Sequence, residues 1–567
     1  MSWARKVLYT MSLAFRLKHP LLEMYGRWIA LGVLFSMVWL FRVTVAWQGF
    51  AAWDSSDECD YAQLARNVSR GWGVVTSCSR PFELCIFPSI PHPELTRGPG
   101  LPILLGMSLK LFGEREMSLL LPIGGLYVLT VLLVGHLTQR LTDSFLAGLC
   151  ASFLYGFSHL ALLYSSSVGV EIAQAFFVIS AVRVCLVCKP SNTSFLWQGF
   201  FLGCGTWFRF SVVLLAPGLF CMGGVRWEGR KTLRRGMMLC LGLLGSVLPL
   251  LGHNLKNTGY IFSPVYRYSC MATPGALEGY AVWCRLSLPK ERPSFLERLP
   301  TNGWRGIQTA AYSFRTLCVT RSWTDIASTT DPNRNGWARA QGLLWCLCLL
   351  TGSVWIAIKR PGFGVGVLLL GSSHLLASAF LGFCHLRYWF FLYPVLCVLA
   401  VLPWLGPQGW LAPWRVSRSP WGISSFVGSL LVLCLVWPLF PLGRQLEQAK
   451  AYRRGNPFPE VASVVRSRVQ QDAVVCTDVA WQTTWFGDVR TVWLPYQASD
   501  FSDLEALVPV DLLVLTNLWT PQLVGWNRTW HDLLESPQRA EALLGGSWRS
   551  AVIQRGRLRI ALFERSS

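Results

Sequence analysis

Residues 28–66 read WIALGVLFSMVWLFRVTVAWQGFAAWDSSDECDYAQLAR and join an apolar run to an acidic segment. The run from Trp28 to Ala46 is close to the ~20 residues that an α-helix needs to cross a bilayer. Four carboxylates follow within seven residues, at Asp54, Asp57, Glu58 and Asp60. The sequence therefore predicts a membrane span that leads directly into an acidic segment at the membrane surface.

The residues after Asp57 predict a helix. Tyr61, Leu64 and Ala65 follow at i+4, i+7 and i+8, and these positions share one helix face. Asp57 then lies in the first turn or at the N-cap, where backbone N–H groups favour an anion. A carboxylate held there can act as a general base beside the lipid surface. The alternative interpretation is a solvated acidic cap on an interfacial helix.

The composition predicts an all-α polytopic membrane bundle. The chain has 567 residues, of which 52% are hydrophobic and 14% are charged, whereas soluble proteins carry about 25% charged residues. We expect about eleven spans of ~20 residues, near 28–46, 118–138, 143–164, 168–188, 195–208, 210–225, 236–252, 340–358, 362–384, 388–405 and 421–442. The net charge of +21 does not indicate nucleic acid, because most Lys and Arg lie in short loops between spans.

The basic loops also predict the orientation. With a cytoplasmic N-terminus, the inner loops contain Arg140, Lys189, the basic run 226–235, Lys359-Arg360 and Arg415 with Arg418. All of them are positive, as cytoplasmic loops are. Loops 47–117 and 253–339 and the C-terminal region then lie outside the cytoplasm. We expect a multi-pass protein of the plasma (inner) membrane.

A change of character near residue 443 predicts two domains, a transmembrane domain over 1–442 and a soluble one over 443–567. The second part has helical patterns near 459–470 and 502–507. Short apolar runs lie at 473–476, 492–494, 511–515, 551–554 and 558–563. Alternating strands and helices of this kind favour a small α/β domain. It has no Gly-rich phosphate motif and no metal motif, so we expect it to bind or pack rather than catalyse. The apolar run 103–112 is too short to span and predicts an interfacial helix.

An ordered series of motifs runs through the membrane part. It comprises Asp57-Glu58-x-x-Tyr61-Ala62, Arg97-Gly98-Pro99-Gly100-Leu101-Pro102, Phe112-Gly113, Glu171, Arg209, His253 to Gly259, and His385-Leu386-Arg387-Tyr388 with Pro394. In this order the series resembles the GT-C superfamily of membrane glycosyltransferases. The nearest branch contains the protein O-mannosyltransferases and the aminoarabinose transferase of lipid A (glycosyltransferase families 39 and 83). The resemblance covers roughly residues 25–440.

The resemblance implies a helical membrane bundle with an active site at its extracytoplasmic face. It implies an inverting transfer of a sugar from a polyprenyl-phosphate donor to a hydroxyl of a lipid, glycan or protein acceptor. By motif match the catalytic base is Asp57, and Glu58 takes the adjacent acidic position. One departure stands out. The aminoarabinose branch has an Arg two residues after the Glu, where it helps hold the donor phosphate, and this chain has Asp60 there.

A lipid phosphate leaves as an anion and needs cationic stabilisation. The candidates on the outer side are Arg97, Arg209, Lys256 and Arg387. Charges at span ends are costly unless they face a wet cavity, although snorkelling to the interface is the alternative interpretation. The remaining substrate-binding candidates are Tyr61, Glu171, His385 and Tyr388. Loop carboxylates could supply oxygen ligands to a divalent metal, but the branch that the chain resembles works without one, and we expect no cofactor.

Two other functions stay open. A transporter or lipid flippase would use a similar bundle and buried charges without transfer chemistry. Transporters commonly show internal repeats and midplane sites, whereas this chain has no clear repeat and collects its charges at one face. A non-catalytic descendant whose C-terminal domain recruits a partner is the third possibility, and the intact Asp57-Glu58 pair argues against it.

Overall fold

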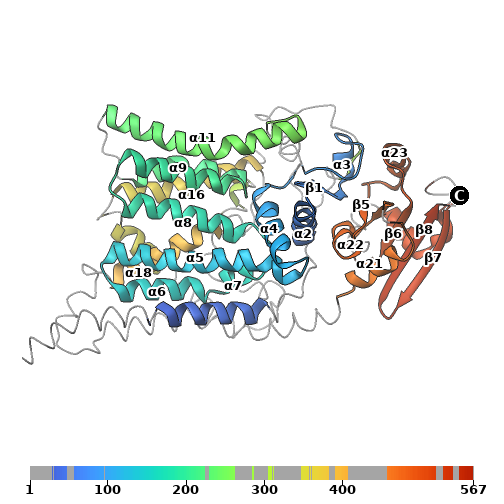
Figure 1. Cartoon of the computed structure of the whole chain (residues 1–567), viewed down its shortest axis with the longest axis horizontal. Helices are drawn as coiled ribbons and strands as arrows, with labels where there is room; N and C mark the ends of the chain where they lie inside the picture. The colour runs from blue at the N-terminus through green and yellow to red at the C-terminus, as the bar shows by residue number, and fades with distance from the viewer. Residues whose placement is uncertain are drawn as a thin grey trace, which may run out of the picture.

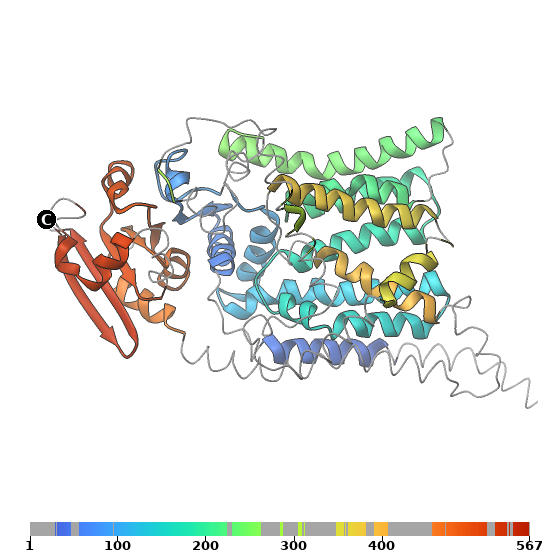
Figure 2. The ribbon, with the colours of Figure 1, turned by 180° about the vertical axis from the view of Figure 1, so that it is seen from behind.

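The computed structural model describes residues 29–46, 56–261, 284–286, 347–405 and 456–565, with a few isolated residues between 304 and 311. Within these ranges it leaves out 30, 95, 224–228, 357, 359–360, 382–389, 471, 519–527, 541–543 and 545–547. A bundle of helices occupies one end of the molecule and an α/β domain the other (Figure 1). The segment that begins with the acidic helix lies between them, and the view from behind shows the same order (Figure 2).

The bundle consists of roughly parallel helices (Figure 1). Their bounds are Leu31–Ala46, α5 Glu116–Thr142, α6 Phe145–Gly156, α7 His159–Ser165, α8 Glu171–Val187, α9 Asn192–Thr206, η1 Phe210–Leu215, α10 Ala216–Met222, α11 Arg230–Thr258, α16 Pro361–Leu381, η3 Phe390–Leu392 and α18 Tyr393–Leu405. Among the described residues, α5 and α11 are long and apolar enough to cross a membrane, and the other apolar helices are shorter. The helical class is confirmed. The count of eleven spans is not, and the span predicted at 421–442 lies outside the described residues.

The single span predicted over 143–164 is wrong in one respect, because the helix breaks. α6 ends at Gly156 and α7 begins at His159. Ser158 caps the new helix by accepting a hydrogen bond from the Ala161 amide at 3.2 Å. The hydroxyl of Tyr127 donates to the Gly156 carbonyl, which is one of those left open at the end of α6. Each side of the break therefore gains a side-chain hydrogen bond. Apolar periodicity alone did not reveal the break.

The acidic segment forms α2 (Ser56–Ser69), and the apolar run after it forms α4 (Gly100–Phe112). Both helices were predicted. α4 packs against α2 and α5. The contact with α2 depends on Gly106, where an added Cβ would lie 2.9 Å from the Ala65 carbonyl oxygen. Met107, Leu111 and Phe112 are exposed on α4, and its placement in the membrane interface stays a prediction.

The α/β domain contains strands β4 Val474–Thr477, β5 Arg490–Trp493, β6 Leu512–Thr516, β7 Trp548–Arg555 and β8 Leu558–Arg565. Its helices are α21 Phe458–Arg466, α22 Ala480–Gly487, η6 Ala498–Asp500, α23 Phe501–Leu507, α25 Arg528–Glu535 and η7 Pro537–Arg539. β5, β4 and β6 are parallel, and β8 and β7 continue the sheet antiparallel. Residues 512–516 are all buried, as expected for a central strand covered on both faces. The predicted α/β fold of this region is confirmed.

The sheet also takes a strand from the loop at 47–117. β2 (Cys78–Ser79) pairs in parallel with β5, with Cys78 opposite Thr491 and Ser79 opposite Val492. The strand order is β2-β5-β4-β6-β8-β7. The same loop holds α3 (Pro81–Leu84) and a small antiparallel pair, β1 (Val75–Thr76) with β3 (His92–Pro93). The loop that carries the acidic motif is thus part of the C-terminal sheet.

Candidate functional site

The site begins at the N-terminus of α2. Asp57 occupies its first turn, one of the two positions predicted for it, and Glu58 lies beside it, where the backbone N–H groups favour negative charge. The helix is held from behind, because Cys59, Ala62 and Ala65 are fully buried. The side chain of Asp57 retains 26% exposure. α2 therefore presents two partly accessible carboxylates, Asp57 and Glu58, from a packed helix.

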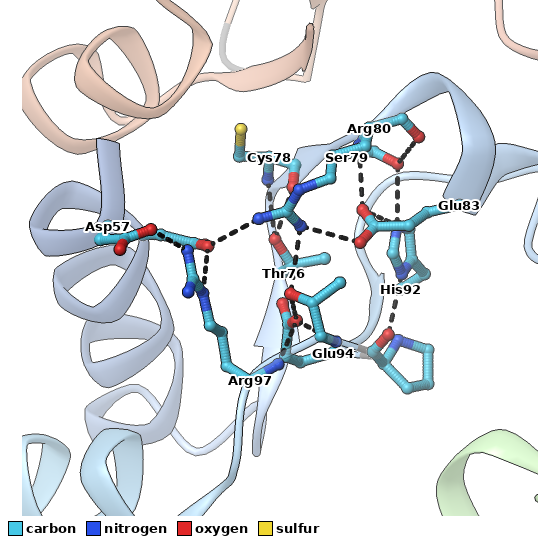
Figure 3. Close-up of polar contacts among 12 residues, drawn as sticks. Asp57, Thr76, Cys78, Ser79, Arg80, Glu83, His92, Glu94 and Arg97 are labelled. Carbon is cyan, nitrogen blue, oxygen red and sulfur yellow. Dashed lines mark hydrogen bonds and ion pairs between the residues drawn. The ribbon is translucent and has the colours of Figure 1, made fainter. Parts of the chain in front are cut away.

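Arg97 joins the acidic residues to one another. Its guanidinium forms an ion pair with Asp57 through Nη2 and donates from Nε to Asp60 Oδ2 at 3.0 Å (Figure 3). Its Cζ lies 5.2 Å from the ring centroid of Tyr61, a cation–π distance. Burial lowers the pKa of Arg97, but the carboxylates of Asp57 and Asp60 outweigh it and raise that pKa well above its ordinary value. Arg97 is therefore a permanent cation at the site.

Asp60, the departure from the aminoarabinose pattern, is fully buried. Its Oδ2 accepts from both Arg97 and Arg80, the latter at 3.1 Å, and its Oδ1 accepts from Gln63 at 3.2 Å. A carboxylate at this position holds two guanidinium groups next to each other instead of contacting a phosphate itself. The cations come from later in the loop.

Arg80 extends the network (Figure 3). Its Nη1 donates to Glu83 at 2.8 Å and to the Thr96 hydroxyl at 3.2 Å. Burial lowers the pKa of Arg80, but the carboxylates of Glu83 and Asp60 outweigh burial and raise it above the ordinary value. Glu83 is itself fully buried, and one of its oxygens accepts from the Arg80 amide at 2.9 Å. The chain thus places a buried ion-pair network directly behind the exposed end of Asp57.

Glu94 lies beneath the same network. One of its oxygens accepts from the Thr96 amide at 2.6 Å and from the Arg97 amide at 2.9 Å, which fixes the turn that carries Arg97. Its other oxygen, Oε2, has no hydrogen-bond partner in the described part of the chain. Burial first, and then the nearby carboxylates of Asp60 and Glu83, raise the pKa of Glu94 to about 7.

The Arg97-Gly98-Pro99-Gly100 element packs against the segment that carries a second cation, Arg209. The Gly100 amide donates to the Trp207 carbonyl at 2.9 Å. A Cβ added at Gly100 would lie 2.9 Å from the backbone of Trp207, so only glycine permits this approach. Trp207 lies two residues before Arg209, whose guanidinium is 3.8 Å from Glu171 at the start of α8.

Tyr61 shows that these groups share one neighbourhood. Burial raises its pKa above the ordinary value, and the charges of Arg97, Arg209, Asp57 and Glu171 all act on it. Glu58 accepts from the Val168 amide at 3.3 Å and so ties α2 to the loop before α8. The structure therefore gathers Asp57, Tyr61, Arg97, Glu171 and Arg209 at one end of the bundle, with Glu58 beside them.

The other predicted residues do not join this group among the described contacts. Lys256 lies exposed in the last turn of α11. His385, Arg387 and Tyr388 fall outside the described residues. A role for each of them stays a prediction, as does the expectation that no metal is needed.

Sequence reasoning missed Arg80, Glu83 and Glu94. No sequence motif links their positions to that of Asp57. A signal did exist for two of them, because Arg80 and Glu83 stand three residues apart among the apolar Pro81, Phe82 and Leu84. Charged residues in an apolar setting are almost never fully buried unless they are paired.

Part of the sequence and the fold are similar to those of known proteins. Residues 92–252 match the family model described as dolichyl-phosphate-mannose-protein mannosyltransferase. The fold is similar to that of the archaeal oligosaccharyltransferase AglB from Archaeoglobus fulgidus, solved with an inhibitory peptide and a dolichol-phosphate. The TM-score is 0.52 at 13% identity, over 89% of this chain and 71% of that chain.

A weaker likeness, with a TM-score of 0.44 at 12% identity, is to ArnT from Cupriavidus metallidurans bound to undecaprenyl phosphate, over 94% of this chain and 97% of that one. A search of curated protein sequences finds no significant relative. The family model covers the segment that holds Arg97, Glu171 and Arg209, and the fold comparison extends over most of the chain. In the sequence of residues 92–252 and in its fold, the chain is thus similar to membrane glycosyltransferases of the GT-C superfamily.

Proposed function

We propose that the protein transfers a sugar from a polyprenyl-phosphate donor to an acceptor hydroxyl, with inversion at the anomeric carbon. The observation that carries this proposal is the placement of Asp57, a partly exposed carboxylate at a helix N-terminus, in an ion pair with Arg97, while the charge of Arg209 acts on the neighbouring Tyr61. A base for the acceptor and cations for a phosphate are the groups that this chemistry requires. The similar oligosaccharyltransferase AglB was solved with a dolichol-phosphate.

The reaction is a single displacement. Asp57 accepts the proton of the acceptor hydroxyl while the hydroxyl oxygen attacks the anomeric carbon from the side opposite the phosphate. The bond between the anomeric carbon and the phosphate oxygen breaks, and the polyprenyl phosphate leaves with the bonding electron pair. Arg97 and Arg209 stabilise the negative charge that develops on the leaving oxygen. The proton on Asp57 then passes to solvent.

The site lies at the end of the bundle that faces the α/β domain (Figure 1). The charge pattern of the loops favours an extracytoplasmic location for this end, with the N-terminus in the cytoplasm. A donor with a long lipid tail would then reach the site sideways from the bilayer. The acceptor is a lipid, a glycan or a protein that carries a free hydroxyl on that side.

The test is sugar transfer by the purified protein from a panel of radiolabelled polyprenyl-phosphate sugars, comparing the wild type with Asp57→Asn. The substitution keeps the shape of the side chain and removes the base, so turnover should fall by about 10²- to 10⁴-fold while donor binding is retained. Asp143→Asn is the matched control. Asp143 is an exposed residue with φ of 50° after α5, and Asn tolerates this conformation equally well.

Unchanged turnover in Asp57→Asn would remove Asp57 from the mechanism. If no donor supports transfer by the wild type and labelled lipid instead moves between the leaflets of proteoliposomes, the protein is a flippase and the proposal is wrong.

A further inference from the structure

The α/β domain meets the active-site helix through α22. Arg66 of α2 donates from Nη1 to the Trp485 carbonyl at 2.8 Å and from Nη2 to the Thr484 carbonyl at 2.7 Å. These carbonyls lie in the last turn of α22, where a cation is favoured, and the Thr484 carbonyl also accepts from the Asp488 amide at 3.0 Å. Arg66 also lies 3.1 Å from Asp488 and stacks over the ring of Trp485 at 5.0 Å. The helix that carries Asp57 is thus bonded to the end of a helix more than 400 residues away in sequence.

The same face of the domain holds Arg80. The guanidinium of Arg80 lies over the ring of Trp481, with its Cζ 5.3 Å from the ring centroid. Trp481 is buried and packs edge-on against Trp493 of β5 at 4.7 Å between ring centroids. A guanidinium that stacks on an aromatic face keeps the donors in its plane free. Arg80 uses these donors in two directions, Nη1 toward Glu83 and Nη2 toward Asp60.

The backbone before Arg80 is fixed by the same domain. β2, which ends at Ser79, pairs with β5, and the Thr491 amide donates to the Ser77 carbonyl at 2.9 Å. Thr491 is in turn tied to α22, because its hydroxyl donates to the Ala480 carbonyl at 3.1 Å. Both the backbone and the guanidinium plane of Arg80 are therefore determined by residues of the C-terminal domain.

We propose that the C-terminal domain positions the catalytic groups, with Trp481 as the positioning residue. This inference rests on the proposed function of the site. The path consists of direct contacts: Trp481 orients Arg80, Arg80 and Arg97 share Asp60, and Arg97 holds Asp57. One apolar core also runs through Ala62 and Ala65 of α2 into Trp481 and Trp485 of α22, so the two parts cannot shift independently.

The test compares Trp481→Leu with Trp481→Phe in the full-length protein. Leu removes the aromatic face and should lower kcat for transfer by about 10- to 100-fold, because small displacements of catalytic groups cost that much. Phe keeps an aromatic face and should restore kcat to within about threefold of the wild type. Trp548→Leu is the control, since Trp548 is a partly buried Trp of the same domain on the far edge strand β7. It should leave kcat unchanged.

Amide hydrogen exchange supplies a readout that does not depend on transfer. Trp481→Leu should accelerate exchange in peptides covering 76–84 and 94–100, and Trp548→Leu should not. If Trp481→Leu does not fold, Arg66→Lys replaces it, because one ammonium cannot reach both carbonyls and Asp488 as the guanidinium does. Arg66→Lys should then lower kcat and accelerate exchange in α2.

The outcomes separate the two proposals. A wild type without transfer activity contradicts the proposed function, and the exchange data then decide the positioning role alone. An active wild type, with Trp481→Leu matching Trp548→Leu in kcat and in exchange, overturns the positioning role and leaves the proposed function intact. Equal losses in the Leu and Phe variants also overturn it, since the aromatic face would then be irrelevant.

Discussion

At the scale of single residues, charge pairing governs the site. Asp60 stands where the aminoarabinose branch has an Arg, yet the site is not short of cations, because Asp60 holds Arg80 and Arg97 together. Removing one member of a buried ion pair leaves an uncompensated charge and destabilises the fold by about 3–5 kcal/mol. The acidic residues of this loop therefore act as a set, and the effect of replacing one depends on what its partners lose.

Glu94 gives the site a pH dependence. Its pKa in the folded protein is about 7, above the ordinary value of 4.5, because of burial and the neighbouring carboxylates. The folded state therefore holds this proton more tightly than the unfolded chain does. The stability that Glu94 contributes is full below about pH 4.5 and is lost as the pH rises through about 7.

Replacing Glu94 by Gln should remove this loss of folding stability at high pH. Gln keeps an oxygen for the amides of Thr96 and Arg97 and carries no charge. Thermal unfolding followed from about pH 5 to about pH 8 should show the wild type losing up to about 3 kcal/mol relative to Glu94→Gln. The control is Glu535→Gln, whose half-exposed carboxylate pairs with Arg559. Parallel pH profiles for the wild type and Glu94→Gln would contradict the prediction.

At the scale of elements, residues 97–100 pack against the C-terminal end of α9. This contact brings the segment that carries Arg97 close to the segment that carries Arg209. The hydrogen bond from the Gly100 amide to the Trp207 carbonyl joins the turn after Arg97 to the segment before Arg209. The backbones approach this closely because Gly98 and Gly100 have no side chains. A Cβ at either position would collide with Trp207 or Phe208.

Gly100→Ala should separate these segments. The added methyl group would meet the Trp207 backbone at 2.9 Å, and overpacking of this kind costs about 1–3 kcal/mol. We expect a lower unfolding temperature and a fall in transfer, measured on the same preparation. Gly125→Ala in α5 is the control, because nothing lies within 4 Å of its added Cβ. A Gly100→Ala protein as stable and active as Gly125→Ala would show that the close approach is not required.

At the scale of the whole molecule, Arg70 links three parts. It donates to Glu114, in the turn between α4 and α5, through Nε and Nη2 at 2.9 Å, and to Asp488 after α22 through Nη1 at 3.0 Å. Arg70 itself follows α2. The acidic helix, the bundle and the α/β domain therefore meet at one side chain, which is partly exposed to solvent.

A double-mutant cycle of Arg70→Gln and Asp488→Asn should give a coupling energy of about 0.5–1 kcal/mol at low salt, since exposed ion pairs contribute little. The coupling should shrink as salt is raised, because these charges are accessible to screening ions. Asn suits residue 488, where φ is 52°. Additive effects at low salt would show that Arg70 and Asp488 do not stabilise the junction.

Much of the architecture was determined by the sequence alone. Composition and apolar run length predict the helical membrane class. Periodicity after Asp57 predicts a helix with that residue in its first turn or at its N-cap, because helix and strand patterns are local properties. The strands of the α/β domain were found for the same reason. The order of the motifs indicated the resemblance to the GT-C superfamily.

Only the tertiary structure decided which charges share the site. Arg80, Glu83 and Glu94 become important because they are buried next to Asp60 and Arg97, and sequence spacing does not reveal burial. β2 has two residues, too few to show a period, so its place beside β5 could not be predicted. The alignment of Trp481 with Arg80 joins segments 401 residues apart (481 minus 80), and such a contact depends on how the whole chain packs rather than on any local preference.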